Sequence, residues 1–129
     1  MLIVKPILDK SLQKELGELC LASYNPDYLA FSAYDDEKFI GFCQFEVSGG
    51  VATVIDLRSI PDLNDFEAMF IMARGALNYM DLCGFHIARC TADAADLTLI
   101  RSVGFKEIDT NLFEMDLTKE FTGNCTNCK

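Results

Sequence analysis

One stretch decides the fold of this 129-residue chain, residues 51–85, which reads VATVIDLRSIPDLNDFEAMFIMARGALNYMDLCGF. Its first eight residues are rich in β-branched side chains and predict a strand over 51–58, which ends before Pro61. Apolar residues then recur at three- and four-residue spacing with no proline among them, which predicts a long helix over about 64–83. Gly84 and Phe85 end that helix, because glycine accepts the left-handed conformation that follows a last helical turn.

The turn between this strand and this helix, residues 60–69, is where we look first for function. At a turn from a strand into a helix, backbone N–H groups point outward, and anionic ligands commonly bind there. Gly75 lies in the middle of the helix, where glycine costs about 1 kcal/mol relative to alanine. We therefore expect Gly75 to let the helix approach a neighbouring sheet closely.

Length, composition and charge limit the classes of protein that this chain can represent. At 129 residues and 50% hydrophobic composition, one domain over 1–118 is expected, followed by a tail over 119–129. No stretch reaches the ~20 apolar residues of a membrane span, so a soluble, cytoplasmic protein that binds no membrane is expected. Twenty acids against eleven bases give a net charge of −9, which disfavours nucleic-acid binding and favours a cationic partner.

The cysteines favour reduced thiols over a disulfide framework. Four of the six lie within apolar helix or strand patterns, and we expect them to be buried: Cys20, Cys43, Cys83 and Cys90. Cys125 and Cys128 have the spacing of half a four-ligand zinc site, so a metal would need ligands from elsewhere. We expect no metal site, and we expect the tail to be a chain end that the domain does not hold.

Before the central stretch, the chain predicts a strand, a helix and a hairpin. A first strand over 2–5 is closed by Pro6, and Asp9 caps a helix. The apolar stripe of that helix is expected to consist of Leu12, Leu16, Leu19 and Cys20. Strands over 28–34 and 39–47 should pair around an acidic turn, and Ser48-Gly49-Gly50 leads into the strand at 51. Three antiparallel strands would then follow one another.

After the long helix, a strand over 86–91 should lie parallel to the strand over 51–58, because the helix has the length of a parallel crossover. Asp93 is expected to cap a short helix that ends at Gly104 and Phe105. Strands over 106–108 and 112–117 should form a last hairpin. The sheet is therefore expected to be mixed.

This order of elements resembles that of the GNAT superfamily of acyl-CoA-dependent N-acetyltransferases over nearly the whole chain. Three local features carry the resemblance beyond the order: Pro61, Gly84 with Phe85, and residues 99–105 (LIRSVGF), which are similar to the family's Leu-Tyr-x-x-x-Gly-Phe segment. The resemblance implies an α/β (α+β) fold with a mixed, mostly antiparallel seven-stranded sheet. It also implies helices on both faces and a fourth and fifth strand that are parallel and splayed.

The resemblance further implies acetyl-CoA, or another acyl-CoA, as cofactor. In the family, the pantetheine arm lies between the splayed strands and the pyrophosphate rests on backbone N–H groups at the start of the long helix. The residues of this chain that would contact the cofactor are Leu57, Arg58, Ser59, Asn64, Asp65, Phe66, Glu67, Ala68, Met69 and Asp93.

The pyrophosphate motif departs from the family's pattern of Arg or Gln, two residues, Gly, one residue, then Gly or Ala. Asn64, Glu67 and Met69 stand in those places. Glycine lets the backbone approach the pyrophosphate, and here two large side chains replace it. Asp65 and Glu67 suit a helix N-terminus electrostatically and can occupy the donors that phosphate would use. They either stabilise the first helical turn or mark a degenerate active site.

Acetylation of an amine needs a base that takes a proton from the attacking nitrogen. Asp56 is the first candidate, because it lies in the apolar fourth strand near the expected cleft. The alternative for Asp56 is an ion pair with Arg58, two residues along on the same face of the strand. Glu46 is a second candidate, with a solvated position as its alternative.

The reaction commonly also needs an acid that protonates the leaving thiolate, and in many relatives this is the tyrosine of the Leu-Tyr segment. Ile100 takes that place here and cannot transfer a proton. Cys90, Tyr79 or water remain as candidates, and the sequence does not select among them. His86, the only histidine, is expected to be structural.

The sequence therefore predicts an acyltransferase-like protein with a degenerate active site, whose acceptor would be a small amine or a basic peptide. The alternative is a non-catalytic binding or interaction module on the same fold. A homodimer is compatible with either. A small redox or metal protein is a third interpretation, which depends only on Cys125 and Cys128.

Overall fold

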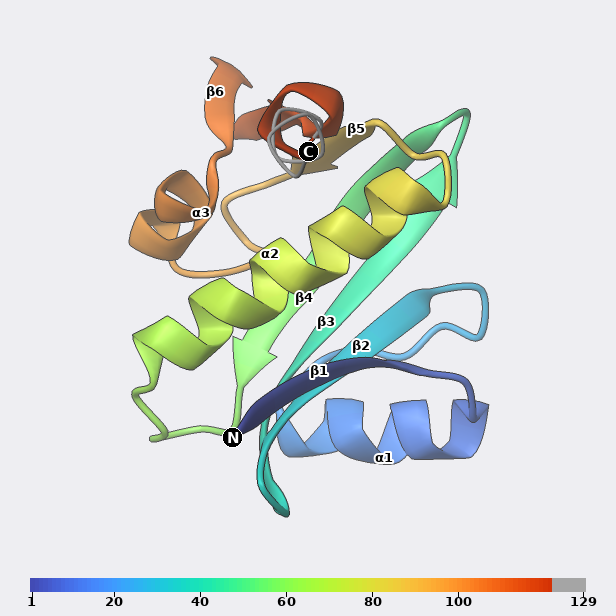
Figure 1. Ribbon diagram of the computed structural model, residues 1–129, viewed down its shortest axis with the longest axis vertical. Helices are drawn as coiled ribbons and strands as arrows, with labels where there is room; N and C mark the ends of the chain where they lie inside the picture. The colour runs from blue at the N-terminus through green and yellow to red at the C-terminus, as the bar shows by residue number, and fades with distance from the viewer. Residues whose placement is uncertain (122–129) are drawn as a thin grey trace, which may run out of the picture.

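The computed structural model describes residues 1–121, in which one sheet separates helices on its two faces (Figure 1). The strands are β1 (Leu2–Ile7), β2 (Leu29–Asp35), β3 (Lys38–Ser48), β4 (Val51–Ser59), β5 (Ile87–Cys90), β6 (Lys106–Asp109) and β7 (Leu112–Asp116). The helices are α1 (Lys10–Leu19), α2 (Phe66–Leu82) and α3 (Leu97–Val103). The strand order in the sheet is β1-β2-β3-β4-β5-β7-β6.

The predicted mixed sheet is confirmed. β4 and β5 pair in parallel, from Val51 opposite Ile87 to Val54 opposite Cys90, and all other neighbouring strands are antiparallel. β4 continues to Ser59, beyond the last residue that β5 pairs with. The two parallel strands therefore part after Val54.

Glycine ends two helices in the predicted way. Gly84 has φ +101°, and the N–H of Phe85 donates to the carbonyl of Met80 at 3.0 Å. Gly104 has φ +129°, and the N–H of Phe105 donates to the carbonyl of Ile100 at 3.3 Å. Both bonds satisfy a carbonyl that the last helical turn leaves free.

Two predictions at element ends are wrong. α3 is capped by Asp96, whose Oδ2 accepts from the N–H of Leu99 at 3.4 Å, and Asp93 does not cap it. The helix begins later than predicted because residues 91–96 first turn back onto β4. β1 continues through Pro6, since β1 is an edge strand and one side of its backbone needs no partner.

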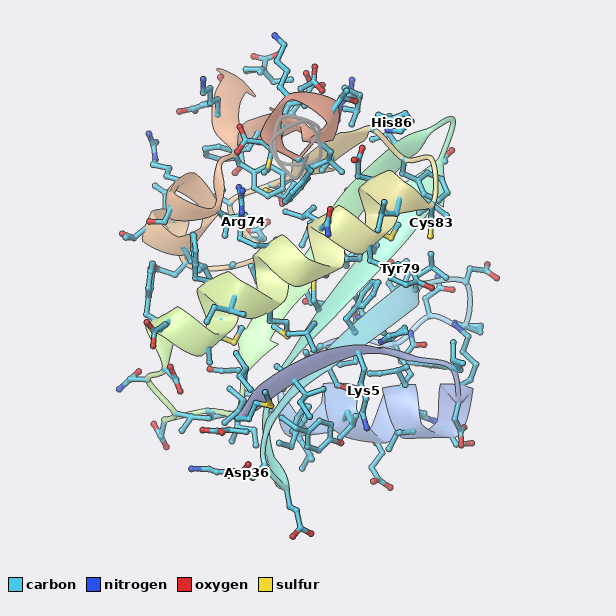
Figure 2. The ribbon with its side chains drawn as sticks, viewed as in Figure 1. Lys5, Asp36, Arg74, Tyr79, Cys83 and His86 are labelled. Carbon is cyan, nitrogen blue, oxygen red and sulfur yellow. The ribbon has the colours of Figure 1, made fainter. Side chains whose placement is uncertain are left out.

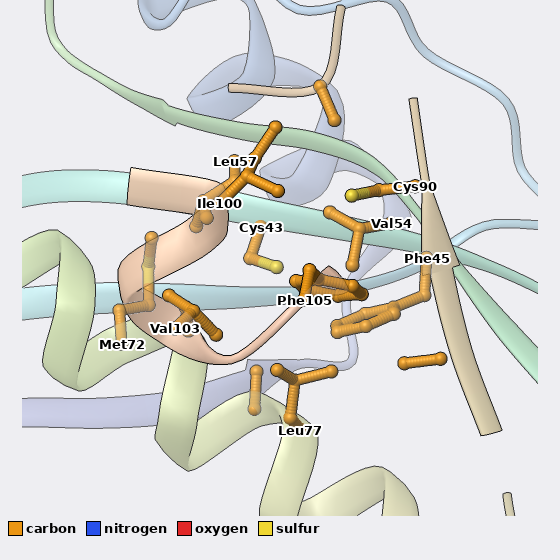
Figure 3. Close-up of a cluster of buried hydrophobic side chains, with 14 of the residues drawn as sticks. Cys43, Phe45, Val54, Leu57, Met72, Leu77, Cys90, Ile100, Val103 and Phe105 are labelled. Atoms are coloured by element: carbon orange, nitrogen blue, oxygen red, sulfur yellow. The ribbon is translucent and has the colours of Figure 1, made fainter. Parts of the chain in front are cut away.

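α2 and α3 cover one face of the sheet over a large apolar core. α2 crosses in front of β3 and β4 in Figure 1, and Figure 3 shows Leu77, Val103 and Phe105 around Phe45. All four side chains are at most 4% exposed. Cys43 and Phe45 of β3 face this core, whereas Phe42 belongs to a smaller cluster with residues of α1. α1 therefore covers the opposite face, because neighbouring residues of a strand point to opposite sides.

The predicted apolar stripe of α1 is wrong by part of a turn. Leu12 and Leu19 are 39% and 51% exposed. Leu16 and Cys20 are buried as predicted, at 4% and 3% exposed, and Gln13 and Gly17 are buried in place of Leu12 and Leu19. The helix is rotated because the amide of Gln13 forms hydrogen bonds inside the protein, which apolar periodicity does not register.

Gly75 does not provide the close approach that we expected of it. It is exposed, and a Cβ there would lie 3.6 Å from Val4, which is ordinary contact. The close approach of α2 to the sheet is at Gly41 of β3, where a Cβ would lie 2.7 Å from the sulfur of Met69. Gly41 therefore makes room for the first turn of α2.

After β7, residues 117–121 form a helical turn that the core holds in place. Phe121 is 9% exposed, and Arg74 donates to Glu120 at 3.0 Å and to the carbonyl of Val103 at 2.8 Å. Figure 2 shows Arg74 on the side of α2 that faces α3. Packing thus extends past residue 118, while Cys125 and Cys128 lie outside the described residues. Within residues 1–121, no helix combines the length and hydropathy needed to cross a membrane.

Candidate functional site

A cavity of about 640 Å³ lies where β4, the start of α2 and residues 93–99 come together. Of the residues that the resemblance marks as cofactor contacts, Glu67 and Ala68 are outside its lining. The lining consists of Cys20, Leu21, Leu57, Arg58, Ser59, Pro61, Leu63, Asn64, Asp65, Phe66, Met69, Asp93, Ala95, Asp96 and Leu99. The volume is in the range of ligand-binding cavities, which are typically about 300–1,000 Å³.

The N-terminus of α2 at this cavity is capped by the protein itself. Oδ1 of Asp65 accepts from the N–H of Ala68 at 3.0 Å, and the carbonyl of Asp65 accepts from the N–H of Met69 at 3.1 Å. Glu67 is exposed at the first turn. Asp65 therefore takes a donor that an anion bound at this helix end would use.

Met69 does not project toward a ligand from the first turn of α2. It is 4% exposed, lies against Gly41 and belongs to the main core, so that only part of its side chain reaches the cavity wall. The large residue in the place of the family's second Gly or Ala is therefore a packing residue.

Residues 91–96, which we call the strap, bridge the gap between β4 and β5. The N–H of Leu57 donates to the carbonyl of Ala94 at 2.8 Å, and Nη2 of Arg58 donates to the carbonyl of Asp93 at 3.0 Å. Ala94 is 1% exposed. The strands part after Val54, but the strap returns to β4 three residues further on. The backbone donor of β4 at this point is thus occupied.

Asp56 forms the ion pair that we gave as its alternative. It is 4% exposed, its Oδ1 accepts from Nε of Arg58 at 2.8 Å, and its Oδ2 accepts from Nε2 of Gln44 at 2.9 Å. Arg58 lines the cavity and Asp56 does not. A role for Asp56 as a base remains a prediction.

Polar residues that were not predicted from the sequence continue from Asp56 to α1. Gln44 and Gln13 are both fully buried, and Nε2 of Gln13 donates to Oε1 of Gln44 at 3.1 Å. Nζ of Lys10 donates to Oε1 of Gln13 at 3.1 Å. The signal for this chain of contacts was a glutamine inside the apolar run Phe42-Cys43-Gln44-Phe45.

The other candidate catalytic residues lie apart from the cavity. Glu46 is exposed and opposite Thr53, at the end of β4 that pairs with β5. Ile100, which was not a candidate because it cannot transfer a proton, is 1% exposed and belongs to the core. Tyr79 packs edge-on against Phe31 at 5.3 Å, near the C-terminal end of α2 with Cys83 and His86 (Figure 2).

The described cysteines are free, and three of the four are buried as predicted. Burial raises the pKa of Cys90 to about 12, and burial with the nearby carboxylate of Asp56 raises the pKa of Cys20 to about 11. These thiols are poor proton donors at neutral pH. Burial likewise raises the pKa of Cys43, whereas Cys83 is exposed, against our prediction. Its position at the α2 C-cap, outside the core stripe, explains the difference.

His86 is a surface residue whose Nδ1 lies 2.7 Å from Oδ1 of Asp81. Among residues 1–121, no group of three His, Cys, Asp or Glu side chains is arranged to hold a metal ion. The histidine therefore has a local partner at the end of α2.

No known family profile matches the sequence, and no curated protein matches it. Solved structures do match in shape. Gcn5 from Tetrahymena has a TM-score of 0.73 and 10% identity, over 89% of this chain and 96% of its own. An IAA acetyltransferase from Bacillus cereus has a TM-score of 0.72 and 15% identity, over 91% of this chain and 100% of its own. PaiA N-acetyltransferase from Thermoplasma acidophilum, in complex with coenzyme A, has a TM-score of 0.71 and 14% identity, over 90% of this chain and 99% of its own. At these identities the likeness is one of fold.

Proposed function

We propose that this protein, which has the GNAT fold, does not transfer acetyl groups from acetyl-CoA and is a non-catalytic binding protein for a small cationic ligand. One observation carries the proposal: the protein's own groups occupy two backbone donors that acetyl-CoA would need. These are the N–H of Leu57, bonded to Ala94, and the N–H of Ala68, bonded to Asp65.

By the resemblance to GNAT enzymes, a pantetheine arm would lie in the gap between β4 and β5, which the strap bridges here. A pantetheine amide would have to replace the 2.8 Å bond between Leu57 and Ala94. It would also have to displace Ala94, which is 1% exposed and packed in the main core. Breaking a satisfied buried hydrogen bond costs about 1–3 kcal/mol unless the ligand restores it in full.

The charge of the cavity opposes a pyrophosphate. Asp65, Asp93 and Asp96 line it, and among the described lining residues Arg58 is the one Lys or Arg. Arg58 is already bonded to Asp56. A carboxylate a few ångströms from a phosphate costs roughly 1–4 kcal/mol where nothing compensates it, or about one to three orders of magnitude in affinity. The cost is smaller for Asp65 and Asp96, because each accepts a hydrogen bond at a helix N-terminus.

The same charge favours an amine. The three carboxylates stand beside apolar wall residues such as Leu63, Phe66 and Leu99. A cation with an apolar body can satisfy both kinds of lining, whereas an anion of the same shape cannot.

Calorimetric titration with acetyl-CoA tests the negative half of the proposal. We expect the wild type to bind with a Kd weaker than about 1 mM. Asp65→Ser/Glu67→Gly should bind at least about tenfold more tightly, because serine still caps the helix while two carboxylates are removed. Met69 is left in place, since it is a core residue.

Asp9→Ser is the matched control, because Asp9 caps α1 through the same kind of side-chain contact at a distant helix end. It should leave acetyl-CoA binding unchanged. Micromolar binding by the wild type would contradict the proposal.

Matched small probes test the positive half. We expect 2-phenylethylamine to shift the NMR signals of the cavity residues at lower concentration than 2-phenylethanol, and 3-phenylpropionate to be the weakest. Asp93→Asn should reduce the preference for the amine, because Asp93 is an exposed carboxylate in the lining. Equal affinity for the three probes would contradict a cationic ligand.

A second candidate is an acyl-CoA-dependent N-acetyltransferase that has kept its activity. The observation in its favour is the position of the 640 Å³ cavity, between the end of β4 and the start of α2. The same titration separates the two candidates. Micromolar binding of acetyl-CoA, with release of CoA on addition of an amine, would favour the enzyme.

A further inference from the structure

We infer that the strap is an autoinhibitory segment, latched onto β4 by Arg58, and that a buried chain of polar side chains between α1 and the sheet holds this latch in position. The strap in this way keeps the gap between β4 and β5 closed, and the closure can be measured without acetyl-CoA.

The strap is a compact unit attached to β4 at two points. Inside it, the N–H of Ala94 donates to the carbonyl of Thr91 at 3.1 Å, which closes a turn. Outside it, the carbonyls of Ala94 and Asp93 accept from Leu57 and Arg58. The internal bond does not involve β4, so release of the strap would break its two bonds to β4 and uncover Ala94, which is 1% exposed, while the turn itself keeps its hydrogen bond.

Arg58 connects the strap to a buried carboxylate. Its Nε donates to Asp56 at 2.8 Å and its Nη2 donates to the carbonyl of Asp93 at 3.0 Å. A guanidinium is planar, so fixing one edge on Asp56 also fixes the direction of the other nitrogens. Lysine has one side-chain nitrogen, so it could donate to the carboxylate of Asp56 without also being held in the direction of the Asp93 carbonyl.

The orientation of Asp56 is set in turn by residues on α1 and β3. Asp56 accepts from Gln44, Gln44 accepts from Gln13, and Gln13 accepts from Lys10, over distances of 2.9–3.1 Å. In residues 1–121, no buried side-chain nitrogen or oxygen lacks a hydrogen-bond partner. A fully satisfied buried network has few alternative arrangements, so it holds the carboxylate in one orientation.

Release of the strap would expose the N–H of Leu57 along the open part of β4. An extended ligand that carries an amide carbonyl could then accept this bond in place of Ala94. The strap therefore competes with such a ligand for one backbone donor, which makes the contact autoinhibitory.

Amide hydrogen exchange at Leu57, followed by NMR, tests the latch. In Arg58→Lys and in Arg58→Gln we expect this amide to exchange at least about tenfold faster than in the wild type, because a charge-assisted hydrogen bond to the strap is lost. Arg89→Gln is the control: Arg89 on β5 has the same 2.8 Å contact from Nε to a carboxylate, that of Glu114, but does not bond to the strap. It should leave the Leu57 rate unchanged.

Gln44→Leu tests the buried chain, and it should also accelerate exchange at Leu57. Amides of β3 serve as the internal reference in each variant. If the exchange rates of all amides rise together in Arg58→Gln, that variant has weakened the whole fold. Arg58→Lys then tests the latch, because it keeps a cation beside Asp56. An unchanged Leu57 rate in Arg58→Lys would overturn the latch, and an unchanged rate in Gln44→Leu would overturn the role of the chain.

Titration with pantetheine, which has amides but no phosphate, tests the autoinhibition. We expect Arg58→Lys to bind it at least severalfold more tightly than the wild type. Equal affinity in both proteins, with faster exchange in the variant, would show a mobile strap that inhibits nothing and would overturn this part of the inference.

Discussion

The two faces of the sheet are built differently. Under α2 and α3 lies a continuous apolar core with side chains such as Phe45 and Met72. Under α1, a small apolar cluster shares the face with Gln13, Gln44 and Asp56, all at most 4% exposed. The first face needs only suitable volumes, whereas on the second each residue needs a particular partner.

The two faces therefore contribute differently: one stabilises the domain, and the other positions a side chain at the cavity. The apolar face supplies most of the burial that stabilises the domain. The polar face adds less stability, because buried hydrogen bonds largely replace bonds to water. Asp56 on this face accepts a hydrogen bond from Arg58, which lines the cavity, so the polar face holds the Arg58 side chain in place.

The largest effect is expected on the apolar face. Phe45 is fully buried and packs edge-on against Phe31, with ring centres 5.7 Å apart. Phe45→Ala should lower the free energy of unfolding by about 3–5 kcal/mol, because a large cavity remains. Urea denaturation followed by circular dichroism measures this, and a loss below about 1 kcal/mol would contradict the description of this face.

A smaller effect is expected on the polar face. Gln44→Leu should lower the free energy of unfolding by about 1–3 kcal/mol, because Asp56 and Gln13 each lose a partner. The double variant Gln13→Leu/Gln44→Leu should lose less than the sum of the two single changes, measured in the same urea experiment. Strict additivity would show that the two amides do not interact.

Much of the fold could be predicted because each element carries a local signal. Gly84 and Gly104 mark helix ends by their conformation, and the strand over 51–58 is recognisable from its β-branched residues. The buried face of α1 could not be read this way, since the partner of Gln13 is 31 residues away on β3.

The candidate site was only partly predictable for a related reason. The position of the cavity could be predicted from the turn before α2, because residues such as Asn64 and Asp65 were expected to contact a ligand there and do line the cavity. The strap was missed because it is attached through backbone carbonyls of Asp93 and Ala94, and a carbonyl has no signature in the sequence. The cap of α3 was misplaced as a consequence.

The smallest effect is expected at the edge of the apolar face. Gly75→Ala should raise the free energy of unfolding by up to about 1 kcal/mol, because alanine favours a helix and its Cβ would meet Val4 only at 3.6 Å. Thermal unfolding measures the change. A lower melting temperature would mean that α2 lies closer to β1 than described and would restore our original expectation for this glycine.

The claim that the gap between β4 and β5 is closed by the strap is tested most directly by a crystal structure of the wild type grown with saturating acetyl-CoA. We predict that the N–H of Leu57 remains bonded to the carbonyl of Ala94 and that no cofactor lies between β4 and the strap. A pantetheine arm in that gap, bonded to Leu57 with the strap displaced, would contradict the account.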